Sequence, residues 1–523
     1  MTDLALNSAG FVFFAALVIL VYYLLPEKSR WVFLLVCSAV FYASAGIFGI
    51  IYPLAVITAT YISALSLEKI AKKQTAYLGS EGASLGKEEK KACKKRYVRR
   101  RKAAVLICVL FDVSVLAAGK YLSPFIGGGI SKSAGLGLIL PLGISFFTLQ
   151  AIGYLVDVYR GAVAAERNWF RFALFVSFFP AIVQGPICRF GELGKELCAP
   201  HPFDEKALFR GVTRMLWGFF KKMVVADRIG AAVSTVAGSS GLRGAYVLVL
   251  LLFYTVQLYA DFTGGIDIAI GFSETLGIRL PENFNLPYLS GSLKEYWRRW
   301  HITMCSWFRD YVFYPVSTSA AVGKITALAK SKLGKKAGRR VPLYIASFAA
   351  WFLTGVWHGA GANFIVWGLL NWLVLMVSEE LEPLYARFGN RFGFTGSAPY
   401  RAFTVIRTFA LVCVLNLFDC FPKVGDTLGA LFSLFSVRNA GVLFDGSLMN
   451  LGLTGTDYVL LAVGIALMTA VAAVGKKHDL RDAIYSKPYA VRLAAIVCLA
   501  AAVVIFGAYG IGYDASSFIY NRF

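Results

Sequence analysis

Histidine and acidic residues are scarce in this chain of 523 residues. Four histidines and 30 aspartates and glutamates stand against 53 lysines and arginines, and charged residues of both signs make up only 16% of the sequence. A soluble protein carries about a quarter of charged residues, whereas hydrophobic residues here reach 58% and the mean hydropathy is +0.63. The scarcity of charge therefore excludes an ordinary soluble protein and indicates an integral membrane protein.

Sequence patterns of several common sites are also missing. The chain has no glycine-rich phosphate loop of the Walker type and no His-Glu-x-x-His zinc motif. Its nine cysteines are scattered, without metal-ligand spacing or a disulfide framework, so we interpret them as small hydrophobic residues. No repeat of halves is visible, which argues against a secondary transporter built from inverted repeats. We expect no metal site and no tightly bound cofactor.

Long apolar stretches take up most of the chain. Each can cross a hydrocarbon core of roughly 30 Å as a helix. The alternation of a barrel strand is absent, so we predict an all-α polytopic integral membrane protein with about 11–13 transmembrane helices. The first stretch lacks a basic start and a cleavage site, and we expect a retained helix rather than a signal peptide. The clearest stretches are 10–26, 31–48, 49–66, 103–119, 136–156, 169–184, 244–260, 341–357, 362–378, 402–420, 456–474 and 489–511.

Positive charge is concentrated in loops between these stretches. Short basic loops stay in the cytoplasm, and counting spans between them places both the N-terminus and the C-terminus outside. The net charge of +23 then indicates membrane topology rather than nucleic-acid binding, with attraction for anionic lipid or an anionic cytosolic cofactor as an addition. The basic runs are 67–102, 323–340, 385–393 and 476–481.

Acidic side chains interrupt the apolar segment 254–278. It includes Asp261 and Asp267 and a glycine pair at 264–265 that predicts a break in the helix. Carboxylates at membrane depth are costly unless they are paired or face water, so they mark the protein interior or a cavity. Two interpretations stay open: structural pairing with arginines of the next segment, or a proton relay with His358 in a transporter.

The following segment, 279–316, is amphipathic. Its prolines at 281 and 287 exclude a continuous transmembrane helix. We predict re-entrant or amphipathic helices, with the cluster EYWRRWH (295–301) at a lipid or protein boundary, where amphipathic rings favour the headgroup level.

Two of the four histidines lie in this apolar context. His358 is the one ionisable residue of FLTGVWHGAGANFIVWG (352–368), and His301 ends the WRRWH cluster. A histidine in such a place is either a hydrogen-bonded packing residue or a functional group. Burial depresses the pKa of an imidazole and keeps it neutral, so it can accept a proton as a general base.

Five blocks, taken in order, resemble the membrane-bound O-acyltransferase superfamily. The resemblance covers most of residues 10–420 and is to the bacterial branch that includes alginate and peptidoglycan O-acetylation proteins and the D-alanyl transfer protein of teichoic acid modification. It implies a ring of helices around a thin central partition, with cytoplasmic and extracytoplasmic openings. The blocks are SFFTLQAIGYLVDVYRG (145–161), FFPAIVQGPICRF (178–190), YADFTGGIDIAIGFSETLGIRLPENFNLPY (259–288), EYWRRWHITMCSWFRDYVFYP (295–315) and FLTGVWHGAGANFIVWG (352–368).

The resemblance also implies three parts and a set of roles. Residues 1–120 would hold N-terminal transmembrane helices with the basic cytoplasmic loop 67–102, residues 121–420 the catalytic core, and residues 421–523 an outward loop with C-terminal transmembrane helices. His358 matches the family's catalytic histidine and His301 its second histidine position. The candidate substrate-binding residues are Arg298, Arg299, Trp300, Trp357, Asn363 and Asp310.

The function implied is an O-acyltransferase with His358 as general base. It would move an acetyl group from a cytoplasmic thioester, acetyl-CoA, toward a cell-wall or extracellular polysaccharide. No SGNH-type domain is fused to the chain, so a separate extracytoplasmic partner of that type is expected, and membrane lipid surrounds the protein. The alternatives are D-alanyl transfer from an acyl carrier protein to teichoic acid, and a proton-coupled transporter or flippase.

Overall fold

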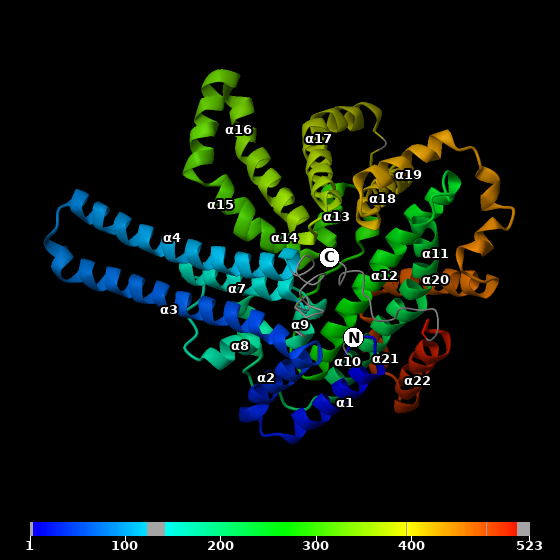
Figure 1. Cartoon of the computed structure of the whole chain (residues 1–523), viewed down its shortest axis with the longest axis horizontal. Coiled ribbons are helices and arrows are strands. Elements are labelled where there is room, and N and C mark those ends of the chain that lie inside the picture. The colour runs from blue at the N-terminus through cyan, green and yellow to red at the C-terminus, as the bar shows by residue number, and fades with distance from the viewer. Residues whose placement is uncertain (1–3, 123–141, 394, 477, 510–523) are drawn as a thin grey trace, which may run out of the picture. The chain divides into compact units, whose positions relative to one another are not determined.

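The regular elements of the fold are all helices. The computed structural model describes residues 4–122, 142–393, 395–476 and 478–509, and within these ranges the chain contains helices and no strand (Figure 1). The all-α class expected from the sequence is thereby confirmed.

The chain forms two compact units. The first joins Met1–Gly211 to Phe272–Pro281, and the second joins Val212–Gly271 to Glu282–Phe523. The first unit holds α1 (Ala9–Leu24), α2 (Glu27–Ser44), α3 (Ile51–Gly79), α4 (Lys87–Ala117), α7 (Ile144–Arg160), α8 (Trp169–Ser177) and α9 (Phe179–Val183). The second holds α11 (Asp227–Gly238), α13 (Leu293–Arg299), α14 (Ile302–Phe308), α15 (Tyr314–Ser317), α16 (Ala320–His358), α17 (Ala362–Phe392), α18 (Ala398–Cys420), α19 (Val424–Ser436), α20 (Gly455–Gly475), α21 (Leu480–Tyr485) and α22 (Tyr489–Phe506). Residues of α10 (Glu205–Phe219) and α12 (Ala245–Thr275) belong to both.

Eight helices of the described residues are long and apolar enough to cross a membrane: α3, α4, α12, α16, α17, α18, α20 and α22. The multi-pass character is clear, although the count lies below the 11–13 helices expected. The apolar stretch 10–26 forms α1, which has only 16 residues, and 169–184 divides into the short helices α8 and α9. The stretch 136–156 lies partly outside the described residues. The three-part division of the chain stays a prediction.

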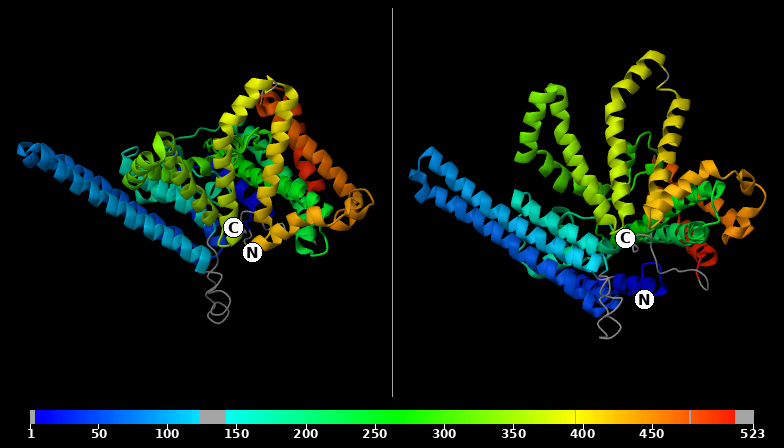
Figure 2. Two further views of the ribbon diagram at one scale, coloured as in Figure 1. Left: turned by 90° about the horizontal axis from the view of Figure 1, so that it is seen from above. Right: turned by 45° about the horizontal axis from the view of Figure 1, so that its top comes forward.

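The basic runs expected to be loops are largely helical. α3 continues to Gly79 and α4 begins at Lys87, so the run 67–102 forms a hairpin whose two helices lie side by side (Figure 2). In the run 323–340, α16 changes direction at Gly334, whose φ of 87° suits glycine. Lysine, arginine, glutamate and alanine favour helix in water. The helices therefore extend beyond the end of their apolar stretches.

The glycine pair at 264–265 does not break the helix, because α12 runs without interruption from Ala245 to Thr275. A Cβ atom on Gly264 would lie 2.8 Å from the carbonyl oxygen of Gly218, and one on Gly218 would lie 2.6 Å from that of Gly264. The expected break is wrong, since these glycines serve instead to bring two helix backbones into direct contact.

Candidate functional site

His358 is the last residue of α16, at a point where α16 crosses α17 at close range. A Cβ atom on Gly355 would lie 2.6 Å from the carbonyl oxygen of Phe364. Only glycine allows the two backbones to approach so closely. The crossing holds the imidazole of His358 against the indole of Trp367, with ring centroids 4.7 Å apart, and leaves the histidine 5% exposed.

His301 lies in the break between α13 and α14. Its φ is +47°, in the left-handed region that residues other than glycine rarely adopt. The side chain is fully buried, and its ring stands edge-on to Phe262 at 4.8 Å between centroids. Burial lowers the pKa of His301 to about 3, so its imidazole is neutral at physiological pH. A rare backbone conformation at a buried histidine is typical of functional sites.

Asn283 fixes the tautomer of His301. The amide oxygen Oδ1 accepts hydrogen bonds from the backbone N–H and the Oγ1 hydroxyl of Thr303, at 3.0 and 2.9 Å. Both lone pairs of this oxygen are then used. Oδ1 also lies 3.3 Å from Nδ1 of His301, but its two lone pairs are taken, so the amide Nδ2, at 3.2 Å, is the atom that donates to Nδ1. With Nδ1 as acceptor, His301 carries its proton on Nε2 and presents a neutral N–H donor.

The indole ring of Trp357 contacts the rings of both histidines. The ring of Trp357 has its centroid 6.0 Å from that of His301 and 5.0 Å from that of His358, and Trp357 is itself 8% exposed. Helix α16 supplies Trp357 and His358, and the α13–α14 break supplies His301. The structure thus brings the two predicted catalytic residues together around Trp357, in a surround of aromatic rings.

Two further predicted residues form walls near these rings. Trp300 packs on Phe284 at 5.0 Å and on Phe262 at 6.1 Å between centroids, so it shares Phe262 with His301. Asn363 is buried in α17 and donates from Nδ2 to the carbonyl oxygen of Phe418 at 3.0 Å, which ties α17 to α18.

The predicted charged residues have contacts of another kind. Arg298 is exposed, Arg299 pairs with Glu295 at 2.6 Å, and Asp310 pairs with Arg309 at 2.8 Å. These contacts join neighbours on the same short helices, and substrate binding by these three residues stays a prediction. Across the residues that the structure describes, His, Cys, Asp and Glu form no group of three or more that could hold a metal ion.

Sequence reasoning missed Asn283, Phe262 and Trp367. The first lies in PENFNLPY (281–288), whose prolines predict a segment outside regular helix but do not mark the asparagine. No sequence pattern distinguishes Phe262 and Trp367, because aromatic residues are frequent throughout this chain. Only the folded structure shows which of them contact a histidine.

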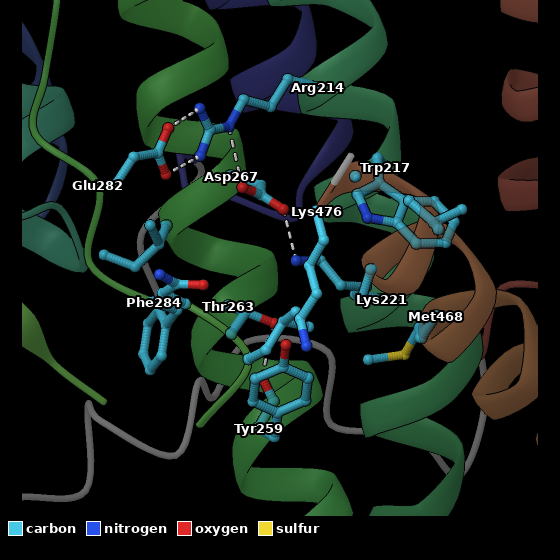
Figure 3. A pocket seen from close by; sticks show the side chains of 16 residues that line it. Arg214, Trp217, Lys221, Tyr259, Thr263, Asp267, Glu282, Phe284, Met468 and Lys476 are labelled. Carbon is cyan, nitrogen blue, oxygen red and sulfur yellow. Dashed lines mark hydrogen bonds and ion pairs between the residues drawn. The ribbon is translucent and has the colours of Figure 1, made fainter. Parts of the chain in front are cut away.

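The carboxylates of α12 are held by cations from the preceding segment. Asp267 pairs with Arg214 at 2.9 Å and with Lys221, and Asp261 pairs with Lys222 at 2.6 Å (Figure 3 shows the Asp267 group). The expectation that the arginines of the next segment are their partners is wrong, since α10 and the π-helical turn Phe220–Ala226 lie against α12 instead. Carboxylates held in this way favour structural pairing over a proton relay.

Comparison with known proteins places these residues in a family. The family model described as MBOAT, membrane-bound O-acyltransferase family, matches residues 164–329. A probable alginate O-acetylase AlgI of Pseudomonas syringae pv. tomato is 33% identical over 344 residues, which cover 63% of this chain and 60% of that protein. A peptidoglycan O-acetyltransferase of Helicobacter pylori is 31% identical over 324 residues, covering 56% of this chain and 57% of the relative.

A teichoic acid D-alanyltransferase of Bacillus subtilis is 30% identical over 284 residues, covering 53% of this chain and 67% of that protein. The matched regions span between 44% and 60% of the length of the alginate relatives. The range that the family model matches includes His301, and the chain belongs to the membrane-bound O-acyltransferase family.

Proposed function

We propose that this protein transfers an acetyl group from a cytoplasmic thioester, acetyl-CoA, to a hydroxyl acceptor on the way to a cell-wall or extracellular polysaccharide. The proposal rests on two buried histidines, His301 and His358, whose rings both pack against the indole of Trp357. The chain that carries them belongs to this acyltransferase family. The names of the relatives, which include O-acetylases of alginate and peptidoglycan, favour acetyl as the group and a polysaccharide as the destination.

His358 acts as the general base. Its imidazole takes the proton of the acceptor hydroxyl while that oxygen attacks the carbonyl carbon of the thioester. The tetrahedral intermediate then collapses, the carbon–sulfur bond breaks, and the proton passes from His358 to the departing sulfur. The products are an ester and a free thiol, so the histidine ends in the form in which it began. A base placed in this way contributes about 10²–10⁴-fold to the rate.

His301 supplies the complementary group. Its Nε2–H, set by Asn283, donates a hydrogen bond to the negative oxygen of the tetrahedral intermediate. A neutral donor suits this role because it needs no counterion in an apolar surround, and because its proton is not lost at physiological pH. Removal of one such donor costs about 10²–10³-fold in related chemistry.

The membrane setting completes the proposal. Acetyl-CoA approaches from the cytoplasmic side, where the basic segments lie, and the acyl group leaves toward the outside, where a separate SGNH-type partner passes it to the polymer. Both termini of the chain are then extracytoplasmic. The alternation of basic and apolar segments supports this orientation.

The test uses purified protein in lipid nanodiscs with radiolabelled acetyl-CoA. Release of free CoA and transfer of label to a hydroxyl acceptor are measured for the native protein, for His358→Ala, and for His478→Ala, which changes an exposed histidine. We expect the first variant to lose at least about 10²-fold in rate and the second to match the native protein. Full transfer by a folded His358→Ala variant would overturn the proposal.

D-alanyl transfer from a carrier protein to teichoic acid is the second candidate. It is favoured by the Bacillus subtilis relative, of which 67% is covered. Mass spectrometry of envelope polymers from a deletion strain separates the two, since either acetyl or D-alanyl esters disappear.

A further inference from the structure

A charged cavity lies beside the histidine site, within the second unit. Its volume is about 240 Å³, well above the roughly 30 Å³ that one water takes up in the liquid, so it can admit a phosphate group. The aromatic rings of Trp217, Tyr259 and Phe284 line it at separate places (Figure 3). Three cations from separate segments line it: Arg214, Lys221 and Lys476.

Arg214 is the buried centre of this cavity. Its guanidinium binds Glu282 in a two-pronged fork, with Nη1 and Nη2 donating to the two carboxylate oxygens at 2.7 and 2.6 Å, while Nε donates to Asp267 at 2.9 Å (Figure 3). The arginine side chain is 12% exposed, whereas that of Glu282 is 61% exposed. Glu282 is therefore the partner that can leave, and it covers the guanidinium from the solvent side.

The charge balance of the cavity favours an anion in place of Glu282. With Glu282 present, three cations face two carboxylates, and within the described part of the chain Lys476 pairs with no carboxylate. If Glu282 turns outward, the same three cations face Asp267 alone. A phosphate offers the guanidinium the same fork of two oxygens as a carboxylate does, and with more charge.

The segment that carries Glu282 also reaches the histidine site. Glu282 and Phe284 line the cavity, while the residue between them, Asn283, binds His301. A displacement of Glu282 therefore acts on the adjacent residue, Asn283, whose amide sets the tautomer of His301.

We propose that this cavity is a binding site for a phosphate ester, closed in the free protein by Glu282, which the phosphate displaces from Arg214. The ester belongs to the pantetheine-type thioester donor or to a phospholipid headgroup. The first assignment rests on the proposed function, and Lys476 supports it because it begins the basic run 476–481, which the charge pattern places on the cytoplasmic side.

The test measures binding without turnover, on full-length protein in phosphatidylcholine nanodiscs. The probes are CoA and pantetheine, which has the same thiol arm without phosphate. Glu282→Gln removes the competing charge and keeps the size of the side chain, and we expect a three- to ten-fold tighter affinity for CoA and an unchanged affinity for pantetheine. Lys476→Gln is expected to weaken CoA binding and to reduce its dependence on salt.

The matched control is Glu379→Gln, which removes a partly exposed carboxylate paired with Lys294 at 3.1 Å and absent from the lining of the cavity. It should leave both affinities unchanged. Hydrogen exchange supplies a second readout, since CoA is expected to speed exchange in residues 282–286 of the native protein and pantetheine is not.

The lipid source is tested by the phosphatidylglycerol that copurifies with each variant. If Glu282→Gln increases retained phosphatidylglycerol and leaves the affinity for CoA unchanged, the site stands with a lipid headgroup as its ligand. If the variant changes neither, or changes CoA and pantetheine equally, the inference is overturned. Its failure is distinct from that of the proposed function, because loss of transfer in His358→Ala does not depend on Glu282.

Discussion

At the scale of single residues, the hydrogen-bond direction at His301 determines what the site can do. An imidazole that donates from Nε2 can stabilise a negative oxygen, whereas the other tautomer presents a lone pair and repels it. Thr303 makes the difference, because its N–H and hydroxyl occupy the oxygen of Asn283 and leave only the amide nitrogen for the ring. Asn283 and Thr303 thus set the tautomer of His301, on which its proposed role depends.

Asn283→Asp reverses this arrangement. A carboxylate accepts from Nδ1 of His301, so the ring proton moves from Nε2 to Nδ1, and the negative charge raises the pKa of His301 from about 3. We expect kcat for acyl transfer to fall about 10²-fold with little change in KM, and the pH profile of kcat to gain a new limb. Asn450→Asp is the control, because it makes the same change of charge at an exposed position. An unchanged kcat in Asn283→Asp would contradict the tautomer assigned here.

Burial of neutral His301 also makes stability depend on pH. The unfolded state takes up a proton near pH 6.5 and the folded state only near pH 3, so the unfolded chain binds more protons between these values. The contribution is fully present above pH 6.5 and is lost as pH falls toward 3, by about 1.4 kcal/mol per pH unit. Thermal unfolding in detergent from pH 7.5 to 5 should fall more steeply for the native protein than for His301→Gln. His478→Gln, at an exposed site, should follow the native slope, and parallel slopes for all three proteins would refute the linkage.

At the scale of helices, the apolar pattern locates the centres of helices better than their ends. The pattern correctly predicted the apolar parts of α12, α17 and α18, because apolar side chains on a helix are favourable in the lipid environment. It misplaced the basic segments 67–102 and 323–340, since a run of lysine and arginine ends a hydrophobic stretch without ending a helix.

At the histidine site, too, the sequence predicted some residues and missed others. His358 was accessible to sequence reasoning because an ionisable group in an apolar block is rare, and His301 was accessible through the family resemblance of its WRRWH block. Asn283 was not, because its function follows from a hydrogen bond to a residue 18 positions away. Such a contact exists only once the segment after α12 has folded against the α13–α14 break.

The crossing of α16 and α17 gives a prediction at this scale. Gly355→Ala places a Cβ atom 2.6 Å from the carbonyl oxygen of Phe364, so the helices must separate. We expect a loss of about 1–3 kcal/mol in unfolding free energy and a fall in acyl transfer, because His358 lies three residues farther along α16. Gly323→Ala, at an open and exposed position of the same helix, should be neutral or slightly stabilising. Equal stability of both variants would show that the crossing tolerates the added methyl group.

At the scale of the whole molecule, the orientation in the membrane decides from which side each substrate can come. The helices α3 and α4 pass from apolar residues directly into the basic hairpin, so this hairpin stands out of the bilayer on one side. The positive-inside rule predicts that this side is cytoplasmic. The same charge pattern predicts that the polar segment 421–455, between α18 and α20, faces outward, which would separate the proposed thioester donor from the acceptor.

Cysteine labelling tests this orientation directly. Cys93 lies half-exposed in the basic part of α4, and a variant that keeps it as the sole cysteine can be treated with a membrane-impermeant maleimide. We expect labelling in inverted vesicles and none in intact spheroplasts, because a hairpin rich in lysine and arginine is not translocated. A cysteine-free protein with Asn450→Cys, at an exposed position of the segment 421–455, should give the opposite pattern. Labelling of both sites from the same side would mean that an odd number of spans has been miscounted between them, and the donor and the acceptor would then have to reach His358 from one face of the membrane.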